Sequence, residues 1–191
     1  MKILKKTAVV SLLAGVFHLL IVACEEVAPL IDFTFEHKDL DFTIDSTLNS
    51  GSGEFLFLDT TIETNIDSLI ESQDGDKDDI KEIRADSLGL EIIDAEINFD
   101  FLKSARITIS SADKPNDVIQ LTSNDFIIPR NQLRSITIPT RDEDLIRLLS
   151  NSDDEDEFVI RIYITRREGA EINKVVNLRA YFRAVAKVSI L

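Results

Sequence analysis

The sequence is poor in the residues on which most enzyme chemistry depends. Its 191 residues include one cysteine, two histidines, two tyrosines and no tryptophan. The lone cysteine, Cys24, excludes an internal disulfide, and a zinc site would lack its usual nitrogen and sulfur ligands. A Ser-His-Asp or Cys-His site would depend on His37, which we expect in a polar turn between two strands. The six glycines form no phosphate-binding cluster.

Aromatic platforms for sugars are also scarce. Acidic side chains are abundant, and paired carboxylates can hydrolyse glycosides. Sites of that kind normally hold the sugar against aromatic rings, and the chain offers only Tyr163 and Tyr181 besides its phenylalanines. We therefore expect that the protein is not an enzyme and needs no cofactor.

The chain has far fewer basic residues than acidic ones. The chain carries 35 acidic and 21 basic residues, a formal net charge of −14 at pH 7. Three of the lysines lie within residues 1–23, so a chain cleaved there would keep 18 basic residues and a net charge of −17. This charge repels nucleic-acid phosphates and anionic lipid headgroups. We expect no nucleic-acid partner.

The N-terminal segment has the three parts of a secretory signal. Lys2, Lys5 and Lys6 precede an apolar run over residues 7–23, which is short for a membrane-spanning helix. The run ends in the sequence Leu20-Ile21-Val22-Ala23-Cys24. This ending resembles the lipobox of bacterial lipoproteins. The resemblance implies that the signal peptide, residues 1–23, is cleaved after Ala23 and that Cys24 carries the lipid.

Glu25 and Glu26 directly follow the cysteine. Acidic residues at this place resemble the export signals of Bacteroidetes-type lipoproteins, which reach the outer face of the outer membrane. The resemblance implies a lipid-anchored protein facing the cell surface. The alternative is that residues 24–30 are only a tether and that the protein faces the periplasm.

Apolar and polar residues alternate over much of the remaining chain, which predicts strands. The similar runs 31–35 and 40–44 predict a hairpin of two strands. Further strands are expected at 55–58, 83–92, 105–109, 118–121 and 133–138. The turn at 114–117 should join two of these strands as a second hairpin.

Two short helices interrupt this pattern. Apolar residues spaced i, i+4, i+7 and i+8 from Ile62 predict a helix over 62–73, with one of residues 59–61 as its cap. Thr140 followed by Glu143 forms a capping box and predicts a second helix up to about Leu149.

Asp74, Asp76 and Asp78 have the 1-3-5 spacing of an EF-hand calcium loop. Position 6 is Asp79 instead of glycine, and position 12 is Ala85 instead of glutamate. The run is therefore a weak calcium candidate, and a solvated loop is the simpler interpretation. No other metal site is expected.

The C-terminal third shows the most regular alternation. Residues 158–164 and 178–188 predict a long antiparallel hairpin with one apolar face. Its other face would carry a basic row of Arg161, Arg179, Arg183 and Lys187. Together the patterns predict an all-β protein, an antiparallel β-sandwich of about seven to nine strands with two short helices, over residues 31–191. A closed barrel is the alternative.

The stretch from Phe99 to Ser110, with the Phe-rich opening strands and the final strands, resembles uncharacterised Bacteroidetes-type β-sandwich cell-envelope lipoproteins. The resemblance implies a cell-envelope location and supplies no active-site residues. Two functions stay open. The first is a structural or interaction module that contacts another envelope protein. The second is a ligand-binding lipoprotein for a glycan or small solute, which the scarcity of tyrosine and tryptophan disfavours.

Overall fold

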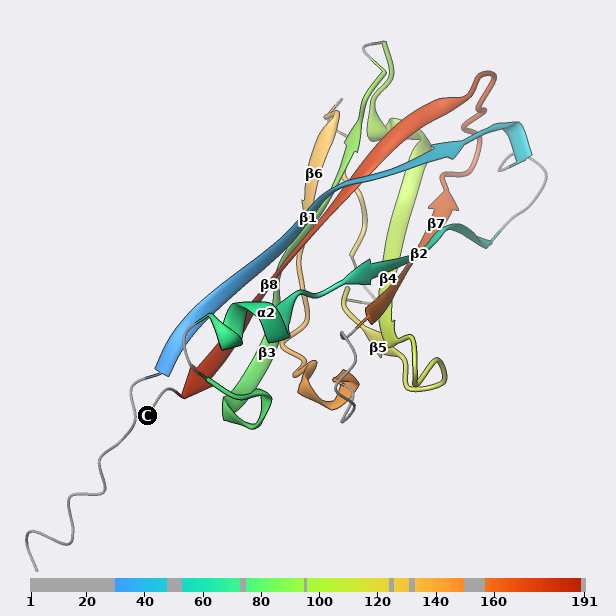
Figure 1. Cartoon of the computed structure of the whole chain (residues 1–191). Helices are drawn as coiled ribbons and strands as arrows, with labels where there is room; N and C mark the ends of the chain where they lie inside the picture. Colours follow the sequence, from blue (N-terminus) through green and yellow to red (C-terminus); the bar gives the residue numbers. More distant parts are fainter. Residues whose placement is uncertain are drawn as a thin grey trace, which may run out of the picture. The chain divides into compact units, whose positions relative to one another are not determined.

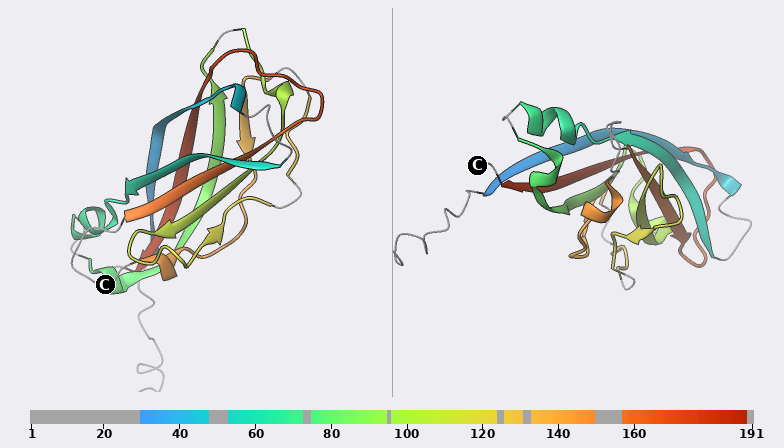
Figure 2. Two further views of the ribbon diagram at one scale, coloured as in Figure 1. Left: turned by 90° about the vertical axis from the view of Figure 1, so that its right-hand side faces the viewer. Right: turned by 60° about the horizontal axis from the view of Figure 1, so that its bottom comes forward.

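The structure, a computed structural model, describes residues 30–47, 53–72, 75–94, 96–123, 126–130, 133–149 and 157–189. These residues form two antiparallel four-stranded sheets, so the predicted all-β sandwich is confirmed. We call them sheet A and sheet B. Their strands cross obliquely in the left-hand view of Figure 2. The predicted signal peptide, Ala23, Cys24 and the pair Glu25 and Glu26 lie outside the described residues.

Sheet A has the strand order β1-β8-β3-β6, and sheet B has the order β2-β7-β4-β5 (Figure 1). Sheet A consists of β1 (Leu30–Ile44), β8 (Val176–Ser189), β3 (Ile80–Ile92) and β6 (Ser135–Ile138). Sheet B consists of β2 (Glu54–Glu63), β7 (Glu157–Arg166), β4 (Leu102–Ser111) and β5 (Ile119–Gln120).

The hydrophobic core lies between the inward faces of the two sheets. Along β8, every second residue from Val176 to Val188 is buried, and the residues between them are not. Along β7, alternate residues from Phe158 to Ile164 are buried in the same way. Both sheets thus present one apolar face, as the alternation in the sequence predicts.

The predicted hairpin over residues 31–44 is wrong, because this segment is the single strand β1, paired with β8 along its length. The prediction followed from the similarity of the two runs, but their apolar residues change from odd to even numbers between Phe35 and Leu40. The structure accommodates the change with a β-bulge. His37 lies opposite Phe182 and Leu40 opposite Ala180, so β1 advances one residue more than its partner. His37 therefore lies in a strand and not in a turn.

The predicted C-terminal hairpin is also wrong. β7 and β8 each have the expected apolar face, but β7 belongs to sheet B and β8 to sheet A. Each strand is central in its sheet and pairs with two other strands. The segment between them, residues 167–175, is too long for a tight turn and passes from one sheet to the other. The predicted basic row is therefore divided between the two sheets. Arg161 lies on sheet B, whereas Arg179, Arg183 and Lys187 lie on sheet A.

The predicted helices are shorter than expected. The first, α2 (Ile66–Glu71), begins after Asn65, a left-handed residue with φ 51°, because residues 59–63 belong to β2 and cannot cap it. At the second, Thr140 bridges to Thr122 instead of capping a helix. Leu145, Leu148 and Leu149 are buried around a single 3-10 turn, η4 (Ile146–Leu148).

The predicted turn at Lys114–Asp117 is present, with the Asp117 amide donating to the Lys114 carbonyl at 3.0 Å, and it joins β4 to β5. Two further 3-10 turns, η2 (Lys77–Asp79) and η3 (Phe99–Phe101), precede β3 and β4. The strand β1 begins at Leu30, opposite Ser189, and ends at Ile44, opposite Val176. We call the end of the sandwich near Leu30 the base and the end near Ile44 the tip.

Candidate functional site

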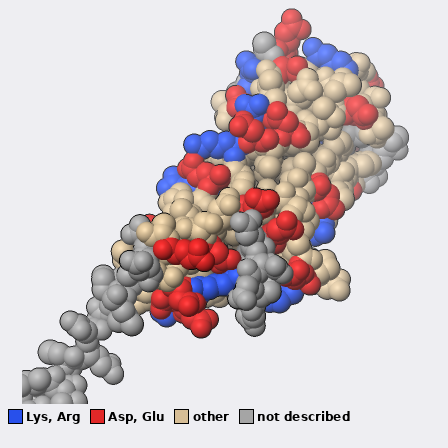
Figure 3. Space-filling view, in the orientation of Figure 1, with Lys and Arg blue, Asp and Glu red and all other residues tan. Residues whose placement is uncertain are grey.

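The outer face of sheet A carries a row of cationic side chains on its central strand. Because β8 alternates, Arg179, Tyr181, Arg183 and Lys187 all point away from the core. The neighbouring strands β1 and β3 place acidic residues on both sides of this row. Figure 3 shows lysines and arginines interleaved with acidic side chains along the line of β1 and β8.

Ion pairs connect this row to both neighbouring strands. Arg179 donates to both carboxyl oxygens of Asp41 on β1, from Nε at 2.8 Å and from Nη2 at 3.2 Å. Arg183 Nε lies 3.2 Å from Asp86 Oδ2 on β3, and Lys187 Nζ lies 2.9 Å from Glu82 Oε2 on the same strand. The basic row of the sequence is thus neutralised locally, by acids on the adjacent strands.

These contacts shift the titration of the groups involved. The hydrogen bond from Arg179 lowers the pKa of Asp41, and the same contact raises the pKa of Arg179. Lys187, assisted by Arg84, lowers the pKa of Glu82 through hydrogen bonds. These groups are half-buried or exposed at the surface, so the pairs organise the surface more than they stabilise the fold.

Tyr181 lies in the middle of the row with an unusual neighbour. Its partner on β3 is Gly89, and a Cβ atom at Gly89 would lie 1.9 Å from both Cε1 and Cζ of the Tyr181 ring. The ring therefore lies across the bare glycine. The Tyr181 hydroxyl is 3.2 Å from the hydroxyl of Thr137 on β6. The missing side chain at Gly89 and the contact with Thr137 together hold the Tyr181 ring against the sheet.

A hollow of about 430 Å³ opens beside this ring. On its far side is the bulge of β1, where Lys38 and Asp39 lie opposite Tyr181. The tilt of the ring toward β6 and the extra residue on β1 together leave the space. The lining is formed by Glu36, Lys38, Asp39, Ser87, Glu91, Arg179, Tyr181, Phe182 and Arg183.

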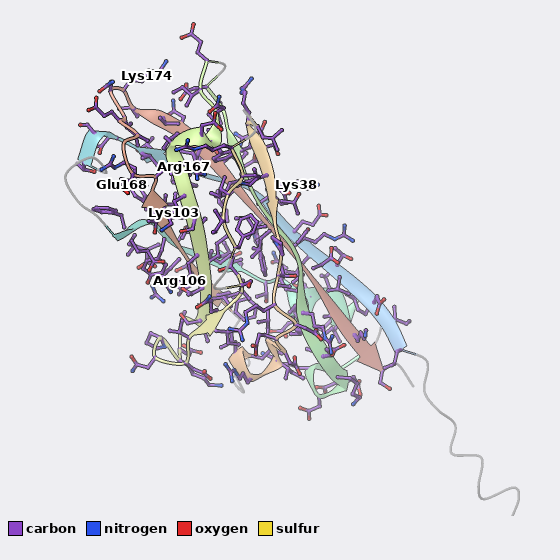
Figure 4. The ribbon with its side chains drawn as sticks, turned by 180° about the vertical axis from the view of Figure 1, so that it is seen from behind. Lys38, Lys103, Arg106, Arg167, Glu168 and Lys174 are labelled. Carbon is purple, nitrogen blue, oxygen red and sulfur yellow. The ribbon has the colours of Figure 1, made fainter. Side chains whose placement is uncertain are left out.

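The second tyrosine is covered instead of open. Tyr163 lies on β7 in sheet B, and the guanidinium carbon of Arg106 is 3.9 Å from its ring centroid. Arg106 also donates from Nε to both carboxyl oxygens of Glu54, at 2.9 and 3.1 Å. This contact raises the pKa of Arg106. Figure 4 shows Arg106 beside β4 and Lys38 beside β1, so the two tyrosine sites belong to different sheets.

The tip of the sandwich exposes several large apolar side chains. Ile93 is 43% exposed, Leu133 44% and Val175 55%. The Ile93 amide donates to Asn177 O at 2.9 Å, and the Ile92 amide donates to Arg134 O at 2.7 Å, so the segments that carry these three residues meet at the tip. A cavity of about 310 Å³ at this end includes Ile97, Phe101, Ile172 and Val176 in its lining.

Arg167 connects the segments that form the tip. Its Nη2 donates to the carbonyls of Leu102 at 2.8 Å and Ile128 at 2.6 Å, and its Nε donates to Asp100 O at 3.2 Å. Figure 4 shows Arg167 with Glu168, Lys103 and Lys174 at this end of the molecule. The three accepting carbonyls come from η3, the start of β4 and the segment 126–130.

Of the three residues of the calcium candidate, Asp76 and Asp78 lie within the described residues and Asp74 lies outside them. Asp76 caps η2: its Oδ1 accepts from the Asp78 amide at 3.1 Å, and its own amide donates to Asp79 Oδ2 at 3.0 Å. These local bonds account for the acidic spacing as a turn motif. Within the described ranges no group of three or more potential ligands gathers to hold a metal ion.

No helix in the described part of the chain has both the length and the apolar character needed to cross a membrane.

The hollow beside Tyr181 was not predicted from the sequence. A glycine inside a strand, where it weakens the sheet, is the one signal that could have indicated it.

Comparison with known proteins identifies no family, since no family model and no curated protein matches the chain. Among solved structures, the chain is similar to a semi-empty virus-like particle of a nodavirus of the giant freshwater prawn Macrobrachium rosenbergii. The TM-score is 0.36 at 11% identity, covering 88% of each chain.

Two plant viruses are also similar. Desmodium yellow mottle tymovirus gives a TM-score of 0.28 at 12% identity, covering 86% of this chain and 90% of that one. Turnip yellow mosaic virus gives 0.26 at 9% identity, covering 86% and 96%. At these TM-scores the likeness carries no inference about function.

Proposed function

We propose that this protein is a lipid-anchored component of the bacterial cell envelope, in which the β-sandwich serves as an interaction module. The observation that carries the anchor is Cys24, the sole cysteine, placed at the end of a lipobox-like sequence behind a basic and then apolar segment. Two or three acyl chains on such a cysteine would hold the protein firmly, whereas a single chain binds only marginally. Strand β1 starts six residues later, at Leu30.

Replacing Cys24 by serine is expected to abolish lipidation. Without the thiol there is no acceptor for the diacylglyceryl group, and the negative charge of the chain gives no electrostatic substitute. Growth with labelled palmitate followed by detergent phase separation measures the effect. Label in the variant, or a cleaved variant that stays with the membrane, would contradict the anchor. Ser50→Ala, a substitution outside the signal, serves as the control.

We further propose that Glu25 and Glu26 direct the protein to the outer surface of the outer membrane. Replacing both with alanine should leave lipidation intact but protect the protein from protease added to whole cells, because it would then face the periplasm. Immunoblots after protease treatment measure this. Equal digestion of the variant and the natural protein would show that the two acids are only part of a tether.

The interaction role is supported by the apolar tip. Single exposed apolar residues are common on proteins, whereas several gathered together mark contact surfaces. Ile93, Leu133 and Val175 are exposed on three segments that meet through backbone hydrogen bonds at the tip, the end of the sandwich away from Leu30. A protein partner that docks on the tip of the domain would meet these residues.

A photo-reactive amino acid at Val175 should therefore crosslink to an envelope protein on intact cells. The matched control is Val118, which is 46% exposed and follows the β4–β5 turn at the base of the sandwich. We expect a discrete larger species from position 175 and none from position 118, read by immunoblot and mass spectrometry. Crosslinking at both positions, or at neither, would remove the tip as the contact surface.

A further inference from the structure

We propose that the hollow beside Tyr181 binds a neutral saccharide. This site lies on the outer face of sheet A, apart from the apolar tip, and the proposal depends neither on the lipid anchor nor on a protein partner. It rests on three features of the hollow: an immobilised aromatic ring, a rim with both hydrogen-bond donors and acceptors, and a suitable volume.

The ring of Tyr181 is prepared for stacking. Gly89 lies beneath it and the Thr137 hydroxyl meets its own at 3.2 Å, so one face of the ring is against the sheet. Tyr181 is also one of the residues that line the hollow. The face of an aromatic ring carries partial negative charge, which attracts the weakly positive C–H groups of a pyranose. Because the ring is already fixed, little side-chain entropy is lost on binding.

The rim favours a ligand without net charge. Arg179 is paired with Asp41, and Arg183 is paired with Asp86. An anionic ligand would compete with these carboxylates, and a cationic ligand would compete with the guanidiniums. A neutral polyol can instead add hydrogen bonds to paired groups, since a guanidinium has five N–H donors and a carboxylate several acceptor sites. Ser87 and Glu91 offer further polar groups from β3.

The volume and the contrast with Tyr163 agree with this assignment. At about 430 Å³ the hollow falls in the range of about 300–1,000 Å³ typical of small-ligand sites. Tyr163 has the same side chain in an equivalent outward position on the other sheet, but Arg106 covers its ring. Tyr163 is therefore the matched control for Tyr181.

The chain itself supplies an optical probe. It contains two tyrosines and no tryptophan, so in a Tyr163→Phe background Tyr181 is the only tyrosine that fluoresces. The whole chain, purified in a detergent without a sugar headgroup, would be titrated with cellotriose, maltotriose, xylotriose and mannotriose, and with trigalacturonate as the charged counterpart. We expect at least one neutral trisaccharide to change the emission saturably, and trigalacturonate to leave it unchanged.

Calorimetry on variants assigns the site. Tyr181→Ala should weaken the binding of that trisaccharide at least tenfold, and so should Gly89→Val, whose side chain expels the ring. Tyr181→Phe keeps the stacking surface and should stay within about threefold, and Tyr163→Ala should have no effect. If Gly89→Val does not fold, Tyr181→Ala decides alone, since the Tyr181 side chain lies on the surface.

The proposal is overturned if no neutral trisaccharide binds at about 10 mM, tenfold above a weak Kd of about 1 mM. Binding that Tyr181→Ala leaves intact, or that only trigalacturonate shows, also overturns it.

Discussion

Replacing Phe182 by alanine is expected to lower the free energy of unfolding by about 3–5 kcal/mol. The side chain is 1% exposed, and its ring lies 6.0 Å from the ring of Phe35 in a tilted arrangement. Its neighbours on the same face of β8 are Ala180 and Ala184, which are too small to close the gap. The loss therefore combines the transfer energy of the phenyl group with a cavity that remains open.

Arg183 is the matched control for this experiment, because it follows Phe182 on β8 and faces the opposite way. Its ion pair with Asp86 is exposed, so Arg183→Ala should change stability by less than about 0.5 kcal/mol. Urea unfolding measures the free energy of unfolding of both variants. The m-value, its dependence on urea concentration, should stay unchanged. If Arg183→Ala proved the more damaging, the assigned orientation of β8 would be wrong.

Arg167→Ala should cost about 2–4 kcal/mol, the second largest effect that we expect. The guanidinium donates to the carbonyls of Asp100, Leu102 and Ile128, and hydrogen bonds from a charged donor contribute about 1.5–3 kcal/mol each before water replaces part of them. Alanine would leave these carbonyls without their donor in a part-buried setting and would release three segments at once.

Arg147 provides the comparison for Arg167. Its contact with Asp117 is long, at 3.7 Å, and both side chains are exposed, so Arg147→Ala should shift stability by less than about 0.5 kcal/mol. Amide hydrogen exchange adds a local measurement. In Arg167→Ala, protection should fall first around residues 99–103 and 126–130. An equal effect of the two substitutions would show that the carbonyl contacts contribute little.

The sequence predicts which residues of this fold face the core better than it predicts which strands are neighbours. Alternation along β7 and β8 identifies their buried residues because the side-chain period of a strand is two regardless of its partner. It also suggested that the two strands pair with each other, which they do not. Pairing depends on long-range packing, and a connection such as residues 167–175 can either return within a sheet or cross to the other.

Local irregularities were the other source of error. The similar runs 31–35 and 40–44 favoured a hairpin, whereas the change of phase between Phe35 and Leu40 is compatible with either a turn or a bulge. The same bulge helps to form the hollow, together with Gly89 beneath Tyr181. The candidate site therefore depends on the features that a periodic pattern cannot describe, a shift of register and a missing side chain.

The long pairing of β1 with β8 also determines how the domain would respond to tension. Any force that arrived through the proposed N-terminal tether would enter at Leu30 and load β1 along its length. Apart from the bulge, the two strands pair from Leu30 opposite Ser189 to Ile44 opposite Val176, so a pull along β1 against the far end of the sandwich loads the hydrogen bonds between them in shear. Interstrand hydrogen bonds that are loaded in shear bear the force together, whereas hydrogen bonds in strands that are peeled apart break one after another. A domain held at Leu30 and pulled at its opposite end would thus be mechanically strong in the direction in which the proposed lipid anchor would strain it.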